Sequence, residues 1–123
     1  MMRYTTLMAY KNKEDQARNA RKHYEANREK IKQRAREHKK KNQAIAKEYI
    51  ELIKSVPCMD CRQKFPTIAM DFDHIRDKHM PVSQMVNAGL SLNRIKEEIE
   101  KCEVVCSNCH RIRTQNRRSK SGD

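Results

Sequence analysis

The stretches CMDC (residues 58–61) and CSNC (residues 106–109) decide the fold of this 123-residue chain. A structural Zn²⁺ site is a tetrahedron of thiolate or imidazole ligands, and each Cys-x-x-Cys pair supplies two thiolates from one tight turn. We therefore expect Cys58, Cys61, Cys106 and Cys109 to close one structural zinc site with no open coordination position. Two redox or packing pairs are the alternative, but the chain lacks a thioredoxin-like pattern.

The composition calls for a metal or a partner. Charged residues make up 36% of the chain, hydrophobic residues only 37%, and there is no Trp, so a chain of this size cannot bury a large core. The net charge of +12 suits a polyphosphate partner such as DNA. No apolar run approaches the roughly 18 residues of a membrane span, and the N-terminus has no signal-like apolar region. These features exclude a membrane protein, a secreted disulfide scaffold and a large-cored enzyme, and predict a cytoplasmic location.

The chain divides near Pro57. Residues 1–56 carry a net charge of +9 and contain no Gly or Pro, which predicts a basic helical arm with one helix from about Lys13 to Ser55. Its apolar positions recur every three to four residues, and only the last third is apolar enough to pack firmly. A solvated charged helix is the plain alternative to a nucleic-acid-binding arm. A coiled-coil adaptor would need a more apolar seam than Asn27, His38 and Asn42 provide.

Residues 57–123 form the predicted second domain. The cysteine pairs are separated by 44 residues, far more than the 15–20 of a compact zinc ribbon, so a structured insertion must lie between them. Cys102, the fifth cysteine, lies outside both pairs, and we expect it to be a half-buried free thiol. The expected elements are an extended stretch over 65–73, a loop over 74–81, a helix over 84–88 capped by Ser83 and stopped by Gly89, a second helix capped by Ser91, a strand over 103–105, and a basic helix opening at His110.

One cluster between the cysteine pairs could do chemistry, namely Asp71-Phe72-Asp73-His74. The zinc site would bring His110 close to Asp73, and a carboxylate with an imidazole makes an open divalent-metal site with room for water and phosphate. His74 could then act as a general base. Asp71 is an alternative ligand if the strand register differs.

Both cysteine pairs, Asp73-His74 and Cys109-His110 occur in an order that resembles the HNH endonucleases, in particular the small zinc-bearing ones of bacteria and their phages. The resemblance spans about residues 57–118. It implies an α+β fold with a small ββα-metal (His-Me finger) domain, here preceded by the long basic helix. The family's middle Asn is replaced by Lys101.

Carried over, the resemblance makes Asp73 and His110 the ligands of a catalytic Mg²⁺, Mn²⁺ or other divalent ion, and His74 the base that activates water against a DNA phosphodiester. Arg111, Arg113, Arg117 and Arg118 would hold flanking phosphates. It also implies a bacterial host cytoplasm and phage packaging proteins as partners. A noncatalytic, zinc-stabilised nucleic-acid-binding module is the competing interpretation. DNA versus RNA, nicking versus double-strand cleavage, sequence preference and oligomeric state stay open.

Overall fold

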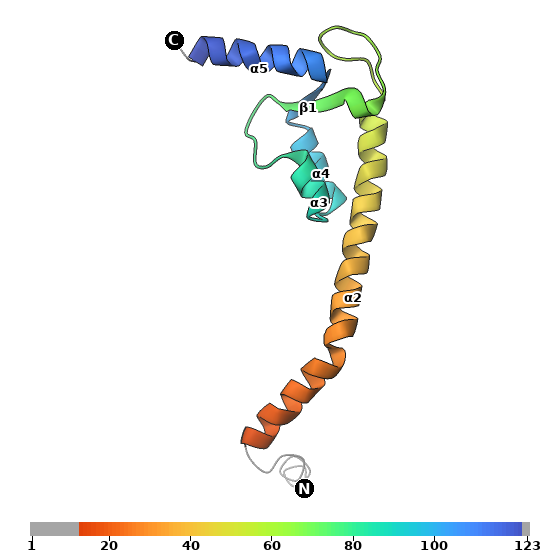
Figure 1. Cartoon of the computed structure of the whole chain (residues 1–123), viewed down its shortest axis with the longest axis vertical. Helices are drawn as coiled ribbons and strands as arrows, with labels where there is room; N and C mark the ends of the chain where they lie inside the picture. Colours follow the sequence, from red (N-terminus) through yellow and green to blue (C-terminus); the bar gives the residue numbers. More distant parts are fainter. Residues whose placement is uncertain (1–12, 122–123) are drawn as a thin grey trace. The chain divides into compact units, whose positions relative to one another are not determined.

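The computed structural model describes residues 13–121 and has an α+β architecture, as the sequence predicts (Figure 1). None of the helices it describes is long and apolar enough to cross a membrane. The chain forms two compact units, one ending at Glu37 and the other beginning at His38. In order, the elements are α2 (Lys13–Lys54), the 3-10 turn η1 (Thr67–Ala69), β1 (Met70–His74), α3 (Val82–Asn87), α4 (Leu92–Ile99), β2 (Cys102–Cys106) and α5 (Ser107–Ser121).

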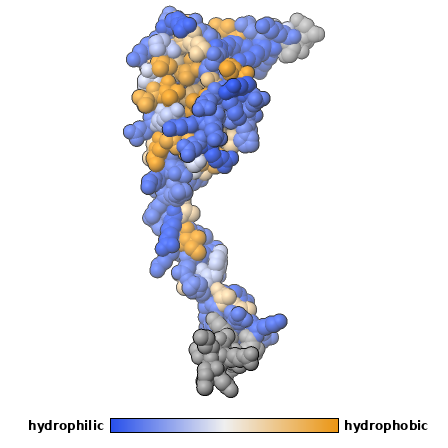
Figure 2. Space-filling view, turned by 180° about the vertical axis from the view of Figure 1, so that it is seen from behind, coloured by the Kyte–Doolittle hydropathy of each residue, from blue (hydrophilic) through white to orange (hydrophobic). Residues whose placement is uncertain are grey.

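The long helix α2 has nearly the predicted limits, because no Gly or Pro interrupts it. Glu14 and Asp15 in its first turn stabilise the helix, because their negative charges lie at the positive end of the helix dipole. Upstream of His38 its side chains are mostly exposed, and hydrophilic residues dominate this part of the surface in Figure 2. This exposure agrees with the prediction that only the last third of the helix is apolar enough to pack firmly.

The second unit has a small apolar core in which α3 and α4 pack against the C-terminal part of α2. Tyr49, Ile50 and Ile53 of α2 and Phe72 of β1 border this core. Packing of this kind explains why only the last third of α2 needs apolar residues. The buried members are Ala46, Val82, Met85, Val86, Ile95 and Ile99.

The turn between α3 and α4 is fitted closely to α2. Gly89 has a φ of +71°, and a Cβ added there would lie 2.6 Å from Cγ of Lys39. Nδ2 of Asn42 donates a hydrogen bond to the Gly89 carbonyl at 2.8 Å. Gly89 is therefore required both by its backbone conformation and by the close approach of α2.

The two short helices start in different ways. Ser91 caps α4 as predicted, with its hydroxyl accepting from the Arg94 N–H at 3.4 Å. The predicted cap of α3 by Ser83 is wrong. That helix begins at Val82, directly after Pro81, whose fixed φ of −60° suits the entry to a helix and whose carbonyl accepts the first N–H bonds.

Strands β1 and β2 pair antiparallel, with Met70 opposite Cys106 and His74 opposite Cys102. The extended stretch predicted over 65–73 is a strand only from Met70, since η1 precedes it. Helix α5 begins at Ser107, earlier than the predicted start at His110, so Cys109 lies in its first turn. β1, β2 and α5 together place both cysteine pairs and the acid–histidine residues in one region.

Candidate functional site

The four cysteines of the two Cys-x-x-Cys pairs form one cluster, whose sulfur atoms all lie within 4.8 Å of one another. Four sulfurs on a tetrahedron at the Zn–S distance of about 2.3 Å would be about 3.8 Å apart, so the cluster could hold a metal ion such as zinc. In residues 13–121 this is the only group of three or more Cys, His, Asp or Glu with ligand atoms so close together.

The surroundings favour the thiolate at Cys58, whereas burial and the neighbouring thiols raise the pKa values of Cys61 and Cys109. The backbone N–H of Cys106 donates to Sγ of Cys58 at 3.2 Å, and that of Cys109 to Sγ of Cys106 at 3.4 Å. Burial opposes ionisation of Cys58, but the backbone N–H groups of Cys106, Cys61 and Asp60 outweigh it and lower the pKa of Cys58 to about 6. Met70 and Val105 pack beside the buried sulfurs, so the cluster is also a second small core.

Arg113 of α5 connects the first cysteine turn to β1. Its Nε and Nη2 donate to the carboxylate of Asp60, which lies between Cys58 and Cys61, at 2.7 and 2.6 Å. Its Nη1 donates to Asp73 and to Glu103, each at 2.9 Å. Four N–H bonds thus hold a guanidinium that is largely buried, and they fix the first cysteine turn relative to the strand.

Asp73 is almost fully buried, at 2% exposed. Arg117 binds both its carboxylate oxygens, at 2.8 and 2.7 Å, and Arg113 adds a third bond. Burial disfavours the charged form, but the two guanidiniums overcome this and hold the pKa of Asp73 at about 2. The carboxylate is ionised and paired with cations on α5.

His110 of α5 lies between the two aspartates of β1. Its Nδ1 is 3.0 Å from Oδ2 of Asp71, and its Nε2 is 3.5 Å from Oδ1 of Asp73. Asp71 and His110 are each about one-third exposed, whereas Asp73 is buried. The 3.0 Å separation suits a hydrogen bond, and it equally suits two neighbouring ligands on one octahedral ion with bonds of about 2.1 Å.

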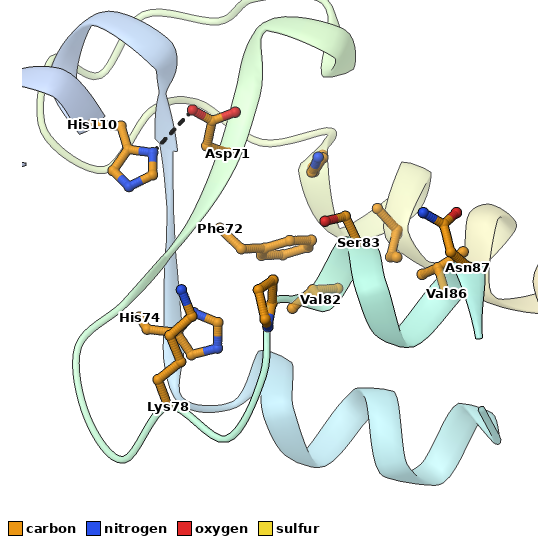
Figure 3. A pocket seen from close by; sticks show the side chains of 12 residues that line it. Asp71, Phe72, His74, Lys78, Val82, Ser83, Val86, Asn87 and His110 are labelled. Atoms are coloured by element: carbon orange, nitrogen blue, oxygen red, sulfur yellow. Dashed lines mark hydrogen bonds and ion pairs between the residues drawn. The ribbon is translucent and has the colours of Figure 1, made fainter. Parts of the chain in front are cut away.

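His74 belongs to the opposite face of β1, because successive strand residues alternate in direction. Its Nε2 lies 2.9 Å from Oε2 of Glu98, a buried carboxylate on α4. Asp71, His74 and His110 nevertheless line one cleft of about 450 Å³, together with Lys54 and residues of α3 (Figure 3).

The four arginines predicted to hold phosphates have different surroundings. Arg111 and Arg118 are exposed on α5. Arg113 and Arg117 point to the sheet and pair with Asp73, although Arg117 keeps about half of its side chain exposed. Residues 110, 113 and 117 share one helical face by their spacing, so the sequence pattern could have shown that these two arginines differ from the others.

Sequence reasoning missed two functional candidates, Asp60 and Glu98. Glu98 carries a signal, because it stands next to the apolar Ile99 and one turn after Ile95 on the face of α4 that the sequence predicts to be buried. A carboxylate among buried positions has a partner or a function.

Comparisons with known proteins identify no relative of this chain, so a function has to be inferred from the geometry of the site. No protein-family model matches the chain, and neither the curated proteins nor the solved structures gave a significant match.

Proposed function

We propose that the protein is a metal-dependent endonuclease of the HNH type that hydrolyses DNA phosphodiester bonds, with zinc held by the four cysteines. The observation that carries the proposal is the single cleft lined by Asp71, His74 and His110, which gathers a carboxylate and two imidazoles beside a four-cysteine cluster. The strand pair β1 and β2 followed by α5, with α3 and α4 inserted between the strands, agrees with a ββα-metal unit.

The catalytic ion would be held by His110 and one aspartate. The sequence predicts Asp73 for this role, with Asp71 as the alternative. We favour Asp71, because its carboxylate is accessible and 3.0 Å from Nδ1 of His110, while both oxygens of Asp73 are bonded to arginines. A bound Mg²⁺ or Mn²⁺ would stabilise the negative charge that develops on the phosphorus oxygens and the leaving oxygen.

The other roles belong to side chains of the chain itself. His74 accepts the proton of the attacking water, a task for which an imidazole is suited near neutral pH. The exposed arginines of α5, chiefly Arg111 and Arg118, would bind flanking phosphates and position the DNA strand without reading its sequence. The basic residues of the arm, part of the net charge of +12, would extend that contact. The phage packaging partners implied by the resemblance stay an expectation.

One observation favours a second candidate, a noncatalytic zinc module that only binds nucleic acid. Asp73, the ligand expected from the HNH resemblance, is neutralised by Arg113 and Arg117. If Asp71 does not replace it, the cleft holds no ion, and the basic surface is the functional part.

Cleavage of supercoiled plasmid with Mg²⁺ or Mn²⁺ tests the proposal, comparing the wild type with His74→Ala and His74→Gln. The Gln variant keeps a donor for Glu98 but has no basic ring nitrogen, which separates catalysis from packing. We expect both variants to lose about 10²-fold or more of the rate, the contribution of a general base. His79→Ala is the matched control, because His79 is an exposed histidine of the following loop.

Zinc content and DNA binding by gel shift are measured on every variant. If the wild type keeps zinc and binds DNA but does not cleave the plasmid with any divalent ion, the nuclease proposal is wrong and the binding module replaces it. If the wild type cuts and the folded His74 variants cut equally well, another group is the base.

A further inference from the structure

Glu98 is a buried carboxylate with three donors directed at it. The residue is 3% exposed. Its Oε2 lies 2.9 Å from Nε2 of His74 and accepts the backbone N–H of His79 at 2.9 Å, while its Oε1 accepts from Nζ of Lys101 at 3.0 Å. Because His74 and His79 lie on either side of the loop after β1, one side chain holds both ends of that loop.

The protonation state of Glu98 follows from these contacts. Burial alone would favour the neutral acid, but the His79 N–H and the Lys101 ammonium outweigh it and lower the pKa of Glu98 to about 2. An ionised carboxylate only accepts hydrogen bonds. The short contact with His74 therefore requires the proton on Nε2, and in the neutral ring Nδ1 carries the free lone pair.

The same loop is held from a second side. Nζ of Lys101 donates to the Asp77 carbonyl at 3.2 Å, and the N–H of Ile75 donates to the Lys101 carbonyl at 2.9 Å. Glu98 lies in the last turn of α4, and Lys101 follows two residues after the helix ends. The residues that follow β1 are thus fixed to α4 through side-chain and backbone bonds.

We propose that Glu98 is the positioning residue of His74: its carboxylate fixes the ring as the Nε2–H tautomer, so that Nδ1 is the atom that takes the proton of water. The inference rests on the proposed nuclease function for its catalytic meaning. The carboxylate also stabilises the charge that the ring gains when Nδ1 is protonated, in the way a buried Asp supports a catalytic His. Glu98 touches neither substrate nor ion.

The test uses the full-length, zinc-loaded chain and the variant Glu98→Gln. Gln has nearly the same size but can offer an N–H as readily as an oxygen, so it no longer dictates which ring nitrogen is protonated. Glu97→Gln is the matched control, because Glu97 precedes it on the same helix and is exposed. Ring ¹⁵N–¹H NMR assigns the tautomer of His74, and plasmid nicking gives kcat and KM.

We expect the wild type and Glu97→Gln to show the Nε2–H tautomer, and Glu98→Gln to show a mixture or the other form. Nicking by Glu98→Gln should fall by about 10- to 100-fold in kcat with KM for DNA unchanged, as for other residues that orient a catalytic group. An Nδ1–H tautomer in the wild type, or an unchanged tautomer in Glu98→Gln, overturns the proposal. So does a wild-type kcat in the Gln variant.

Failure of the two proposals can be told apart. If the wild type does not cut but the tautomer depends on Glu98, the nuclease function is wrong and the control of the ring by Glu98 stands. If Glu98→Gln loses zinc or fails to fold, Glu98→Asp replaces it, since this variant keeps the charge and withdraws the oxygens by one methylene. The Asp variant should then retain the Nε2–H form only in part, and full retention of tautomer and kcat would count against the proposal.

Discussion

Asp71 and Asp73 stand two residues apart on β1 and lie on the same face of the strand, yet the fold gives them opposite surroundings. Asp73 is buried and bonded to two arginines, whereas Asp71 is accessible at the edge of the cleft. A buried carboxylate between guanidiniums supports structure, and an accessible one beside an imidazole can exchange water for an ion.

Variants at these two positions should therefore fail in different ways. Asp71→Asn should weaken Mn²⁺ binding by about 10-fold or more with little loss of stability, because it removes a ligand charge. Asp73→Asn should lower the free energy of unfolding by about 2 kcal/mol, because it removes an ionised acceptor that is bonded to both Arg113 and Arg117. Mn²⁺ titration followed by EPR and urea unfolding measure the two effects.

Asp77→Asn serves as the control for both, because Asp77 is exposed in the following loop and uses only its backbone carbonyl. Loss of Mn²⁺ binding in Asp73→Asn at unchanged stability would contradict this assignment. It would restore Asp73 as the ligand, as the sequence predicts.

At the scale of elements, the C-terminal part of α2 is attached to the second unit by a polar contact as well as by its apolar face. Asn42 donates to the Gly89 carbonyl at 2.8 Å, and Gln43 donates to the Asn87 carbonyl at 3.0 Å. Both acceptors lie where α3 ends, at carbonyls that have no partner inside the helix. Side chains of α2 thus complete the C-terminus of α3.

Asn42→Ala should lower the free energy of unfolding by about 1 kcal/mol, the usual contribution of one such hydrogen bond. Asn27→Ala is a natural control. Asn27 lies fifteen residues before Asn42 in the same helix, and each of the two residues comes four positions after a histidine. The side chain of Asn27, however, donates only within the helix, to the His23 carbonyl. Thermal unfolding of both variants measures the difference, and equal effects would mean that the Gly89 contact contributes nothing.

At the scale of the molecule, the antiparallel register of β1 and β2 brings together cysteines that are far apart in the chain. Met70 lies opposite Cys106, and Met59 donates its N–H to the Val104 carbonyl at 3.1 Å, which lays the first cysteine turn beside β2. The buried apolar groups around the sulfurs are few. A bound metal would therefore supply a large part of the folding free energy of this region.

Removal of the metal should abolish cooperative unfolding of this region. We expect about one zinc per chain in the wild type and in Cys102→Ser, and none in Cys106→Ser, because Cys102 lies outside the sulfur cluster. Cys102 is half-buried, its thiol donates to the Glu98 carbonyl at 3.4 Å, and burial raises its pKa to about 11. Metal analysis and circular dichroism before and after treatment with a chelator check this prediction. An unchanged unfolding transition in the metal-free chain would contradict it.

Local patterns were sufficient for most elements. The helix over 13–54, the stop at Gly89 and the cap at Ser91 each depend on residues within a few positions, and each cysteine pair depends on its own Cys-x-x-Cys turn. The α3 start was wrong, because Pro81 directs the chain into the helix before Ser83 can cap it.

The sequence by itself determined which four cysteines could hold a metal ion, the basic helix and the identity of the acid–histidine residues, because residue type and local spacing limit what they can form. Only the tertiary structure decided which groups meet. Asp73 is 40 residues from Arg113 and His74 is 24 from Glu98, so their contacts depend on how β1 packs against α5 and α4. Such pairing follows from burial and side-chain direction in three dimensions, for which no local pattern exists.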